Sequence, residues 1–201
     1  LSNRYVHYAY LRPKSELNEG ERANYIQHKL KGIFGDIASN WAVRASEADA
    51  DGGVTIAAVD GALIDGIKHA LGPQLAATAS IQPHFSVAYD RVRSNVVDES
   101  TWFVVQEHKH VVVGYLDNLR WKSLAGRQVR DATADALFAL LDREHVLQNV
   151  PNFCEKVCVV STHSFPASHF PSPARYRVKT LNMLRPDGFP INRKRDYALA
   201  A

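Results

Sequence analysis

Cysteine, methionine and long apolar runs are scarce in this chain of 201 residues, which contains two cysteines and one methionine. No stretch approaches the roughly 18–20 apolar residues that a membrane-spanning helix requires. Neither sign of charge predominates, because the chain has 24 Lys and Arg residues and 21 Asp and Glu residues. The formal charge of +3 argues against nucleic acid as a partner. The basic run Arg193–Arg195 beside Asp196 is more typical of a solvated tail than of a phosphate-binding patch.

The two cysteines, Cys154 and Cys158, lie in a segment whose pattern predicts a strand. Four residues along a strand span about 13 Å, whereas disulfide-bonded cysteines need Cα atoms within about 7 Å. We therefore expect two unpaired thiols, which are typical of a reducing compartment. The chain opens at Leu1 without a methionine, so we also expect sequence upstream of it to be missing.

Apolar residues make up 46% of the chain, which is enough for a large core. Their spacing in the first half predicts strands that alternate with helices. The expected strands are 4–11, 41–45, 54–59 and 76–81, and the expected helices are 19–38, 60–71 (ending at Gly72-Pro73) and 85–92. The first helix should be capped by Asn18. Its expected buried stripe is Ala23, Ile26, Leu30, Ile33, Phe34 and Ile37.

The pattern changes after the polar stretch 94–100. Three expected strands, 101–106, 110–116 and 120–124, are joined by tight turns and predict an antiparallel meander. A helix over about 131–148, a strand over 156–160 and a weaker strand near 176–181 should follow. Helices that cover mixed sheets make this an α/β protein. The order from Thr101 to Val160 is the one that opens each lobe of the actin-like, ribonuclease H-like folds.

Several segments resemble a family of proteobacterial pilus-associated proteins. The opening Leu1-Ser2-Asn3-Arg4-Tyr5-Val6-His7-Tyr8, up to Pro13, is similar to one strand of this family. The segments 54–71, Ser80-Ile81-Gln82-Pro83 and 101–124 follow in the family's order. The family is the actin-like group that includes the M protein of type IV pilus assembly and the L protein of type II secretion. The resemblance covers most of the chain up to about Gln148.

The resemblance implies an actin-like fold of two lobes, with residues 1–95 as a truncated first lobe and 96–201 as the second. It also implies a cytoplasmic scaffold at the inner face of the inner membrane. Other pilus or secretion assembly proteins, among them an inner-membrane protein, would be its partners, and a homodimer stays open. The first phosphate loop would lie upstream of Leu1.

Active actin-like ATPases hold phosphate on an Asp- and Gly-rich turn between the first two strands of the second lobe, where backbone N–H groups approach the ligand. The matching turn here is Gln106-Glu107-His108-Lys109-His110, which has no glycine. Glu107 would place a carboxylate near a polyanion, and two like charges about 4 Å apart cost roughly 4 kcal/mol at an effective dielectric near 20. Lys109 offsets part of this cost. The turn therefore predicts that ATP binding and catalysis are lost, with no cofactor.

Two other motifs could be read as a zinc site and a hydrolase site, but both are more typical of structural roles. A zinc site could be drawn from Cys154, Cys158, His163 and His169, but the first pair lies on a predicted strand rather than on a turn. Ser161-Thr162-His163-Ser164 lacks the G-x-S-x-G elbow of hydrolases. We therefore expect buried thiols, loop histidines, no metal and no catalytic residues.

Two glycine motifs and the tryptophans could also be read as ligand sites. Asp51-Gly52-Gly53 is typical of a plain loop, and Asp60 before Gly61 is typical of a helix N-cap. His108 and His110 should face solvent. Trp41, Trp102 and Trp121 should pack in the core or between lobes rather than stack on bases.

Three functions remain open at this point. The favoured one is a scaffold that binds proteins. The second is an ATP-binding or ATP-hydrolysing actin-like enzyme whose nucleotide site uses other residues. The third is an α/β protein-binding module unrelated to pili.

Overall fold

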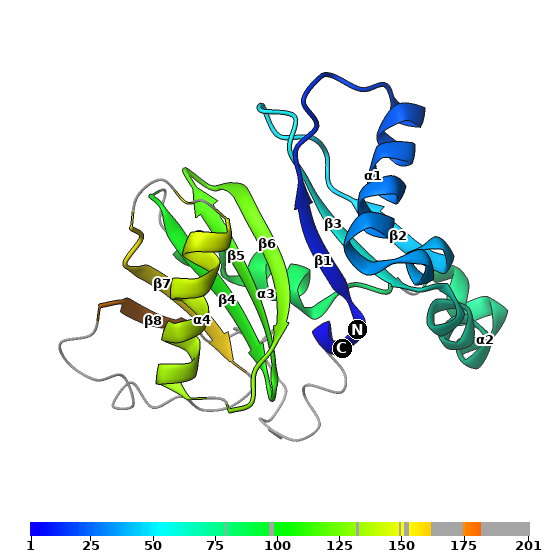
Figure 1. Cartoon of the computed structure of the whole chain (residues 1–201). Coiled ribbons are helices and arrows are strands. Elements are labelled where there is room, and N and C mark those ends of the chain that lie inside the picture. Colours follow the sequence, from blue (N-terminus) through cyan, green and yellow to red (C-terminus); the bar gives the residue numbers. More distant parts are fainter. Residues whose placement is uncertain are drawn as a thin grey trace.

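The computed structural model describes residues 1–78, 80–96, 99–131, 133–148, 150, 153–161 and 175–181. Two β-sheets lie next to each other, and helices lie on the faces of both (Figure 1). One sheet has three strands and the other has five. Short 3₁₀ helices occur at Asn3–Tyr5, Asp36–Asn40 and Arg93–Asn95. No helix in the described part of the chain is both long and apolar enough to cross a membrane.

The three-stranded sheet has the order β1-β3-β2, with every neighbouring pair antiparallel. Its strands are β1 (His7–Leu11), β2 (Trp41–Ala45) and β3 (Val54–Asp60). Helix α1 (Glu19–Phe34) covers one face of this sheet. The expected cap is confirmed, because Asn18 accepts the backbone N–H of Glu21 and Glu21 accepts that of Asn18. The core of this layer is Ala9, Leu11, Ile26, Leu30, Ala38, Val54, Ile56 and Ala58.

The five-stranded sheet has the order β6-β5-β4-β7-β8. Its strands are β4 (Thr101–Glu107), β5 (His110–Asp117), β6 (Arg120–Gln128), β7 (Lys156–Ser161) and β8 (Arg177–Leu181). Strands β4, β5 and β6 form the predicted antiparallel meander, whereas β7 pairs in parallel with β4 and with β8. Helix α4 (Ala134–Leu147) connects β6 to β7, as a parallel crossover requires.

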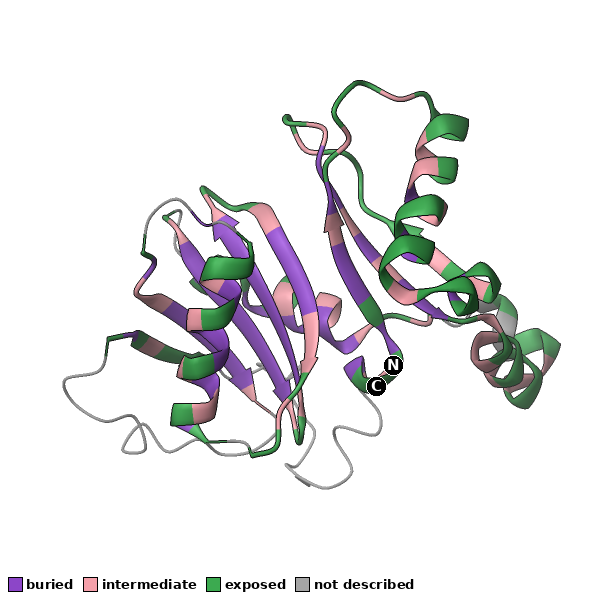
Figure 2. Cartoon of the chain, viewed as in Figure 1, coloured by how far each residue is buried: buried purple, intermediate pink, exposed green. Residues whose placement is uncertain are grey.

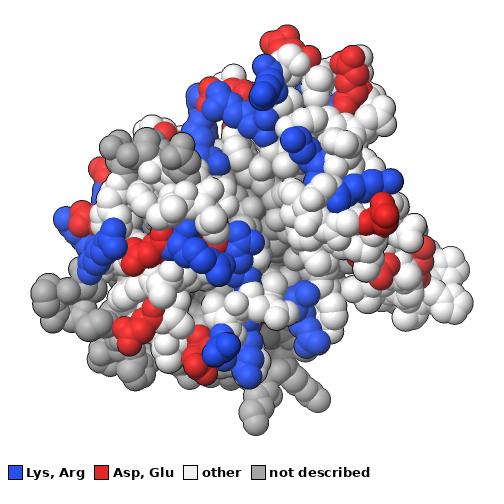
Figure 3. Space-filling view, in the orientation of Figure 1, with Lys and Arg blue, Asp and Glu red and all other residues white. Residues whose placement is uncertain are grey.

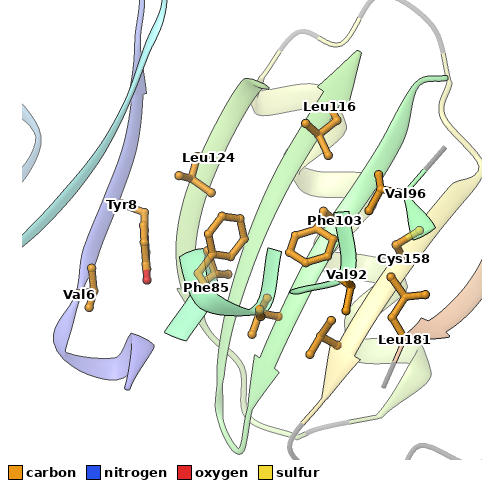
Figure 4. Close-up of a cluster of buried hydrophobic side chains, with 14 of the residues drawn as sticks. Val6, Tyr8, Phe85, Val92, Val96, Phe103, Leu116, Leu124, Cys158 and Leu181 are labelled. Carbon is orange, nitrogen blue, oxygen red and sulfur yellow. The ribbon is translucent and has the colours of Figure 1, made fainter. Parts of the chain in front are cut away.

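Both faces of the five-stranded sheet are buried (Figure 2). Helix α4 packs on one face through Leu137, Leu140 and Leu141. Helix α3 (His84–Val92) lies on the other face, where Phe85 and Val92 join the core. Strand β1 also contacts this side next to β6, and Val6 and Tyr8 belong to the same cluster as Phe103 and Leu124 (Figure 4). This hydrophobic cluster therefore joins the two sheets.

Helix α2 (Gly61–Thr78) differs from the prediction, which ended the helix at Gly72-Pro73 and began a strand at Ala76. Gly72 leaves the helical conformation, with φ 73° and ψ 164°, so the first helical run does stop there. Pro73 then opens a second run, because its fixed φ and missing N–H suit the first turn of a helix. The predicted strand 76–81 was therefore wrong.

The prediction that Ile33 and Ile37 are buried was also wrong. Ile33 is 56% exposed and Ile37 is 66% exposed, although Ile26 and Leu30 of the same stripe are buried. Helix α1 ends at Phe34, and the sheet beneath it has only three strands. Periodicity indicates which residues share a face, but not how far along the helix the sheet extends.

Two boundaries shift by a few residues. Helix α4 begins after Thr133, whose hydroxyl accepts the N–H of Ala136, rather than near Asp131. Strand β7 begins at Lys156, so Cys154 precedes it. Helix α3 falls within 1–95 but packs on the five-stranded sheet. The division into lobes at 95/96 stays a prediction.

Candidate functional site at the β4–β5 turn

The predicted phosphate turn forms a two-residue hairpin loop. Glu107 pairs with His110 at the ends of β4 and β5, and His108 and Lys109 make the turn. His108 has φ 47°, the left-handed conformation that such turns require and that glycine adopts at no steric cost. His108 and Lys109 are exposed, whereas Gln106 is buried. The loop thus keeps a tight shape without the small residues of a phosphate-binding turn.

The carboxylate of Glu107 points to the start of the chain. Its Oε2 accepts the Ser2 hydroxyl at 2.6 Å and the backbone N–H of Asn3 at 2.9 Å. Its Oε1 contacts Nδ1 of His84, the first residue of α3. One carboxylate therefore joins the five-stranded sheet, α3 and the segment that enters β1.

Asn3 extends this polar cluster into the core. Its side chain is fully buried, and Oδ1 accepts the Tyr8 hydroxyl at 2.5 Å and the backbone N–H of Phe85 at 2.8 Å. The backbone N–H of His84 donates to the carbonyl of Leu1 at 2.8 Å. Buried polar groups with such partners fix relative positions, since leaving one unpaired costs about 1–3 kcal/mol.

The electrostatics of the cluster favour a charged Glu107. Burial alone would raise the pKa of its carboxyl. Hydrogen bonds from His84 and Ser2 lower the pKa by more than burial raises it, so the pKa lies below its ordinary value. Burial, reinforced by the nearby Glu107 charge, raises the pKa of Tyr8 well above 10.0.

Burial lowers the pKa of His110. His110 is half-buried, with Nε2 unbonded within the described structure, so the expectation that it faces solvent was wrong.

A groove of about 870 Å³ lies between the open face of the three-stranded sheet and the five-stranded sheet. One wall is β2 with the following residue, Ala42 to Ser46, and the opposite wall includes Tyr89 and Trp121. Arg44, Lys68 and Asp90 are its charged residues. Lys and Arg are interspersed with Asp and Glu on the face drawn in Figure 3. Most residues that line the groove are apolar, so it suits a mainly apolar ligand.

The structure describes two of the four side chains from which a zinc site could be drawn. Cys154 and Cys158 are free and buried, and burial raises the pKa of both thiols. His163 and His169 lie outside the described residues, as do Thr162 and the serine after His163. Among the described residues, no three His, Cys, Asp or Glu side chains lie close enough to hold a metal ion.

The structural roles predicted for Asp60 and for the 51–53 segment are confirmed. Asp60 Oδ1 accepts the N–H of Ala62 at the start of α2, as an N-cap does. The 51–53 segment is a plain loop organised by Asp49, whose Oδ1 accepts the N–H groups of Asp51 and Gly53. Asp51 also pairs with Lys122 on β6, at 2.5 Å.

The three tryptophans pack against protein side chains. Trp102 is 1% exposed, in the core beneath α4. Trp121 lies against Phe85 and Tyr89 of α3, with ring centroids 5.4 and 4.9 Å apart. Trp41 is half-exposed and stacks on His7 at 4.1 Å. The expected packing roles are thus confirmed for all three, since Trp41 also packs against the core beneath α1.

Sequence reasoning found Glu107 but missed its partners Ser2, Asn3 and His84. Only the family resemblance singles out the opening Leu1-Ser2-Asn3. Its one physical signal is polar residues directly before an apolar strand, which is also the pattern of an ordinary loop. Nothing local could link them to a turn more than 100 residues away.

No protein-family model matches the chain, and no curated protein matches it. Two solved structures are similar to it. One is a Bacteroides thetaiotaomicron protein with an actin-like ATPase fold and unknown function, with TM-score 0.51 and 10% identity over 83% of this chain and 59% of that one. The other is a PilM–PilN type IV pilus biogenesis complex, with TM-score 0.53 and 10% identity over 79% of this chain and 60% of that one.

The chain spans about 60% of the length of both structures. Identity of 10% carries the fold and not the activity. The predicted fold class is confirmed, whereas membership of the pilus family stays a prediction. The chain has mixed α/β sheets in an actin-like ATPase fold.

Proposed function

We propose that this chain is a protein-binding scaffold that has kept the actin-like fold and lost nucleotide binding. It acts in the cytoplasm, at the inner face of the inner membrane, in the assembly of a type IV pilus or a type II secretion-like machine. The single observation that carries the loss of nucleotide binding is the bonding of Glu107, whose carboxylate holds Ser2, Asn3 and His84 at the turn where active relatives bind phosphate.

Phosphate at this turn would meet an unfavourable charge. Both Glu107 oxygens are already hydrogen-bonded, and its lowered pKa keeps it negative at neutral pH. A phosphate oxygen about 4 Å away would cost roughly 4 kcal/mol at an effective dielectric near 20, about three decades of affinity. The donors that could offset this cost bind the carboxylate instead. Because phosphoryl transfer depends on positioning and charge stabilisation, catalysis is lost with the site.

The partner surface we propose is the free edge of β2 together with the groove it borders. Among the residues that the structure describes, strand β2 has β3 on one side only, so one row of its backbone groups can pair with an extended segment. Ala42, Tyr89 and Trp121 line the groove beside this edge. PilM in the similar structure is bound to PilN. By analogy, we propose a pilus or secretion assembly protein of the inner membrane as the partner.

Titration calorimetry with ATP and physiological magnesium tests the nucleotide claim. We expect no binding heat and no hydrolysis. Lys109 is the exposed cation of the turn, so Lys109→Ala probes the site without disturbing the core. A dissociation constant in the low micromolar range that Lys109→Ala weakens at least tenfold would overturn the proposal in favour of the ATP-binding enzyme.

The binding surface is tested with the counterpart of PilN from the same cells. Arg44→Glu reverses a charge in the groove wall, and Lys14→Glu makes the same change at an exposed residue away from the groove. We expect Arg44→Glu alone to weaken binding about tenfold, equivalent to 1.4 kcal/mol. Equal effects of the two variants, or no binding by the unmodified chain, would exclude this surface.

A further inference from the structure

Four large apolar side chains in the described part of the chain are more than half exposed, and they form two pairs. Ile33, near the end of α1, and Ile37, in the 3₁₀ helix after it, are 56% and 66% exposed. Val146 and Leu147, in the last turn of α4, are 76% and 61% exposed. Because α1 and α4 lie on different sheets, the two pairs belong to separate surfaces (Figure 1).

Basic residues surround the pair at the end of α1. The segment 22–40 contains Arg22, Lys29 and Lys31, and its one acidic residue is Asp36. Both lysines are exposed, and Lys29 lies one helical turn before the first isoleucine. This part of the surface therefore carries a net positive charge, although basic and acidic residues are nearly balanced in the whole chain.

Aromatic side chains adjoin the same lysines and isoleucines. Phe34 packs on Trp41 with ring centroids 5.2 Å apart, and Nζ of Lys29 lies 5.6 Å from the ring centroid of Tyr25. All three aromatic side chains are partly exposed. Aliphatic and aromatic side chains flanked by long basic ones are typical of surfaces that lie in the interfacial region of a lipid bilayer.

The pair at the end of α4 lies in a different electrostatic setting. Asp142 of this helix pairs with Arg175 at 2.9 Å, and Glu144 pairs with Arg127 at 2.7 Å. Acidic and basic groups therefore compensate each other next to this pair. The two exposed apolar pairs are alike in area but differ in charge, and only the pair on α1 is complementary to an anionic surface.

We propose that the end of α1 is a contact surface for an anionic lipid bilayer. Ile33, Phe34 and Ile37 enter the headgroup region, while Lys29 and Lys31 bind lipid phosphates. A second copy of the chain is disfavoured as the occupant, because two such patches would bring like charges together. The groove is the concave surface of this region, and no residue of α1 lines it.

This contact goes beyond the proposed function, because it needs no protein partner. It is also weak and reversible, since two isoleucines bury less apolar surface than a single myristoyl chain, which gives only marginal binding without a second signal. Because α1 lies on the face of the three-stranded sheet opposite the groove, a partner in the groove and a bilayer at α1 can bind together. The partner then supplies the second signal, and the bilayer contact sets the orientation of the scaffold.

Vesicle flotation with the chain alone tests the contact. We expect the chain to float at low salt with vesicles of equal parts phosphatidylglycerol and phosphatidylcholine, and not with phosphatidylcholine alone. Ile33→Ser combined with Ile37→Ser should lower the partition coefficient about tenfold without a change in charge. The matched control, Val146→Ser combined with Leu147→Ser, removes an equally exposed pair from the other surface and should leave it unchanged.

The lysines are tested in the same vesicles. Lys29→Gln combined with Lys31→Gln should lower the partition coefficient and flatten its salt dependence, because salt screens the attraction between basic side chains and anionic lipid. No flotation of the unmodified chain, or equal losses in the two serine variants, would overturn the proposal. Loss in the lysine variant alone would also overturn it, in favour of an acidic protein bound by charge.

Tryptophan quenching gives a measurement on the unmodified chain. Trp41 is partly exposed next to Phe34, whereas Trp102 and Trp121 lie in the five-stranded region. Brominated phosphatidylcholine in the anionic vesicles should therefore quench part of the emission, and Trp41→Phe should remove the quenched part. Unquenched emission from vesicle-bound chain, or quenching that Trp41→Phe leaves intact, would place another surface on the bilayer and contradict the proposal.

Discussion

The five-stranded sheet is buried on both faces, whereas the three-stranded sheet has a helix on one face and a groove along the other. In the first, β4 has six consecutive buried residues, because α4 and α3 cover opposite faces. In the second, β2 has no buried residue. Figure 2 shows the same contrast between the two halves.

This difference shows where the stability and the available surface of the molecule lie. The strands of a sheet covered on both faces are near-continuous apolar runs, such as 101–105 or 111–116, and the helices on the two faces stabilise the sheet. A sheet with one open face depends on what covers it, and the groove and β2 edge are therefore the surfaces to test for binding. The polar cluster around Glu107 holds the two regions together.

The comparison is tested most strongly by paired truncations of apolar side chains. Leu141 in α4 is fully buried, so Leu141→Ala should lower the free energy of unfolding by about 2–5 kcal/mol. Ile33→Ala in α1 should change it by less than about 0.5 kcal/mol, because Ile33 is 56% exposed. Urea midpoints measure both. Equal losses would show that the end of α1 is covered in solution.

A buried charge pair within the five-stranded region gives the next largest effect. Glu144 of α4 is 1% exposed and accepts Nε and Nη2 of Arg127 on β6 at 2.7 and 3.0 Å. Arg127→Met leaves this carboxylate buried without its bidentate partner and should cost about 3 kcal/mol. Arg12→Met is the control, because Arg12 is exposed and its ion pair with Asp51 is long, at 3.9 Å. Similar unfolding midpoints for the two variants would contradict the importance of the buried pair.

The cluster between the two regions should depend on pH. The folded pKa of Glu107 is lower than its unfolded value, so its contribution is complete above the unfolded pKa and is lost as pH falls through the folded one. Glu107→Gln should cost about 2 kcal/mol at pH 7, as expected for hydrogen bonds to a charged group. This difference should shrink as the pH falls through the folded pKa of Glu107. Urea unfolding from pH 7 to 3 measures it, and a constant difference would show that Glu107 does not titrate as inferred.

The helix caps give the smallest effect and sharpen the comparison. Asn18 caps α1 with a reciprocal bond to Glu21, whereas Thr133 caps α4 through one bond to Ala136. Each change to Ala should cost about 1 kcal/mol. Because α1 packs on one thin sheet, Asn18→Ala should also speed amide exchange along α1, whereas Thr133→Ala should affect only the first turn of α4. Uniform protection of both helices would mean that they are equally well supported.

Local patterns were sufficient for the five-stranded region. Alternating apolar residues and two tight turns predicted the meander, and the spacing of Ala134, Leu137 and Leu141 predicted α4. These signals are reliable because burial on both sides leaves few alternatives. They failed around α2, where the pattern of 76–81 predicts a strand but the helix continues to Thr78.

The sequence by itself determined the fold class and the lack of glycine at the β4–β5 turn, because both depend on residues close together in the chain. Only the tertiary structure decided what Glu107 does there. Its partners Ser2 and Asn3 are 105 and 104 residues away, and they reach it because β1 packs beside β6 while α3 brings His84 to the same place. A carboxylate that could have repelled a ligand instead joins two sheets, because desolvation made its hydrogen bonds to protein donors the favourable arrangement.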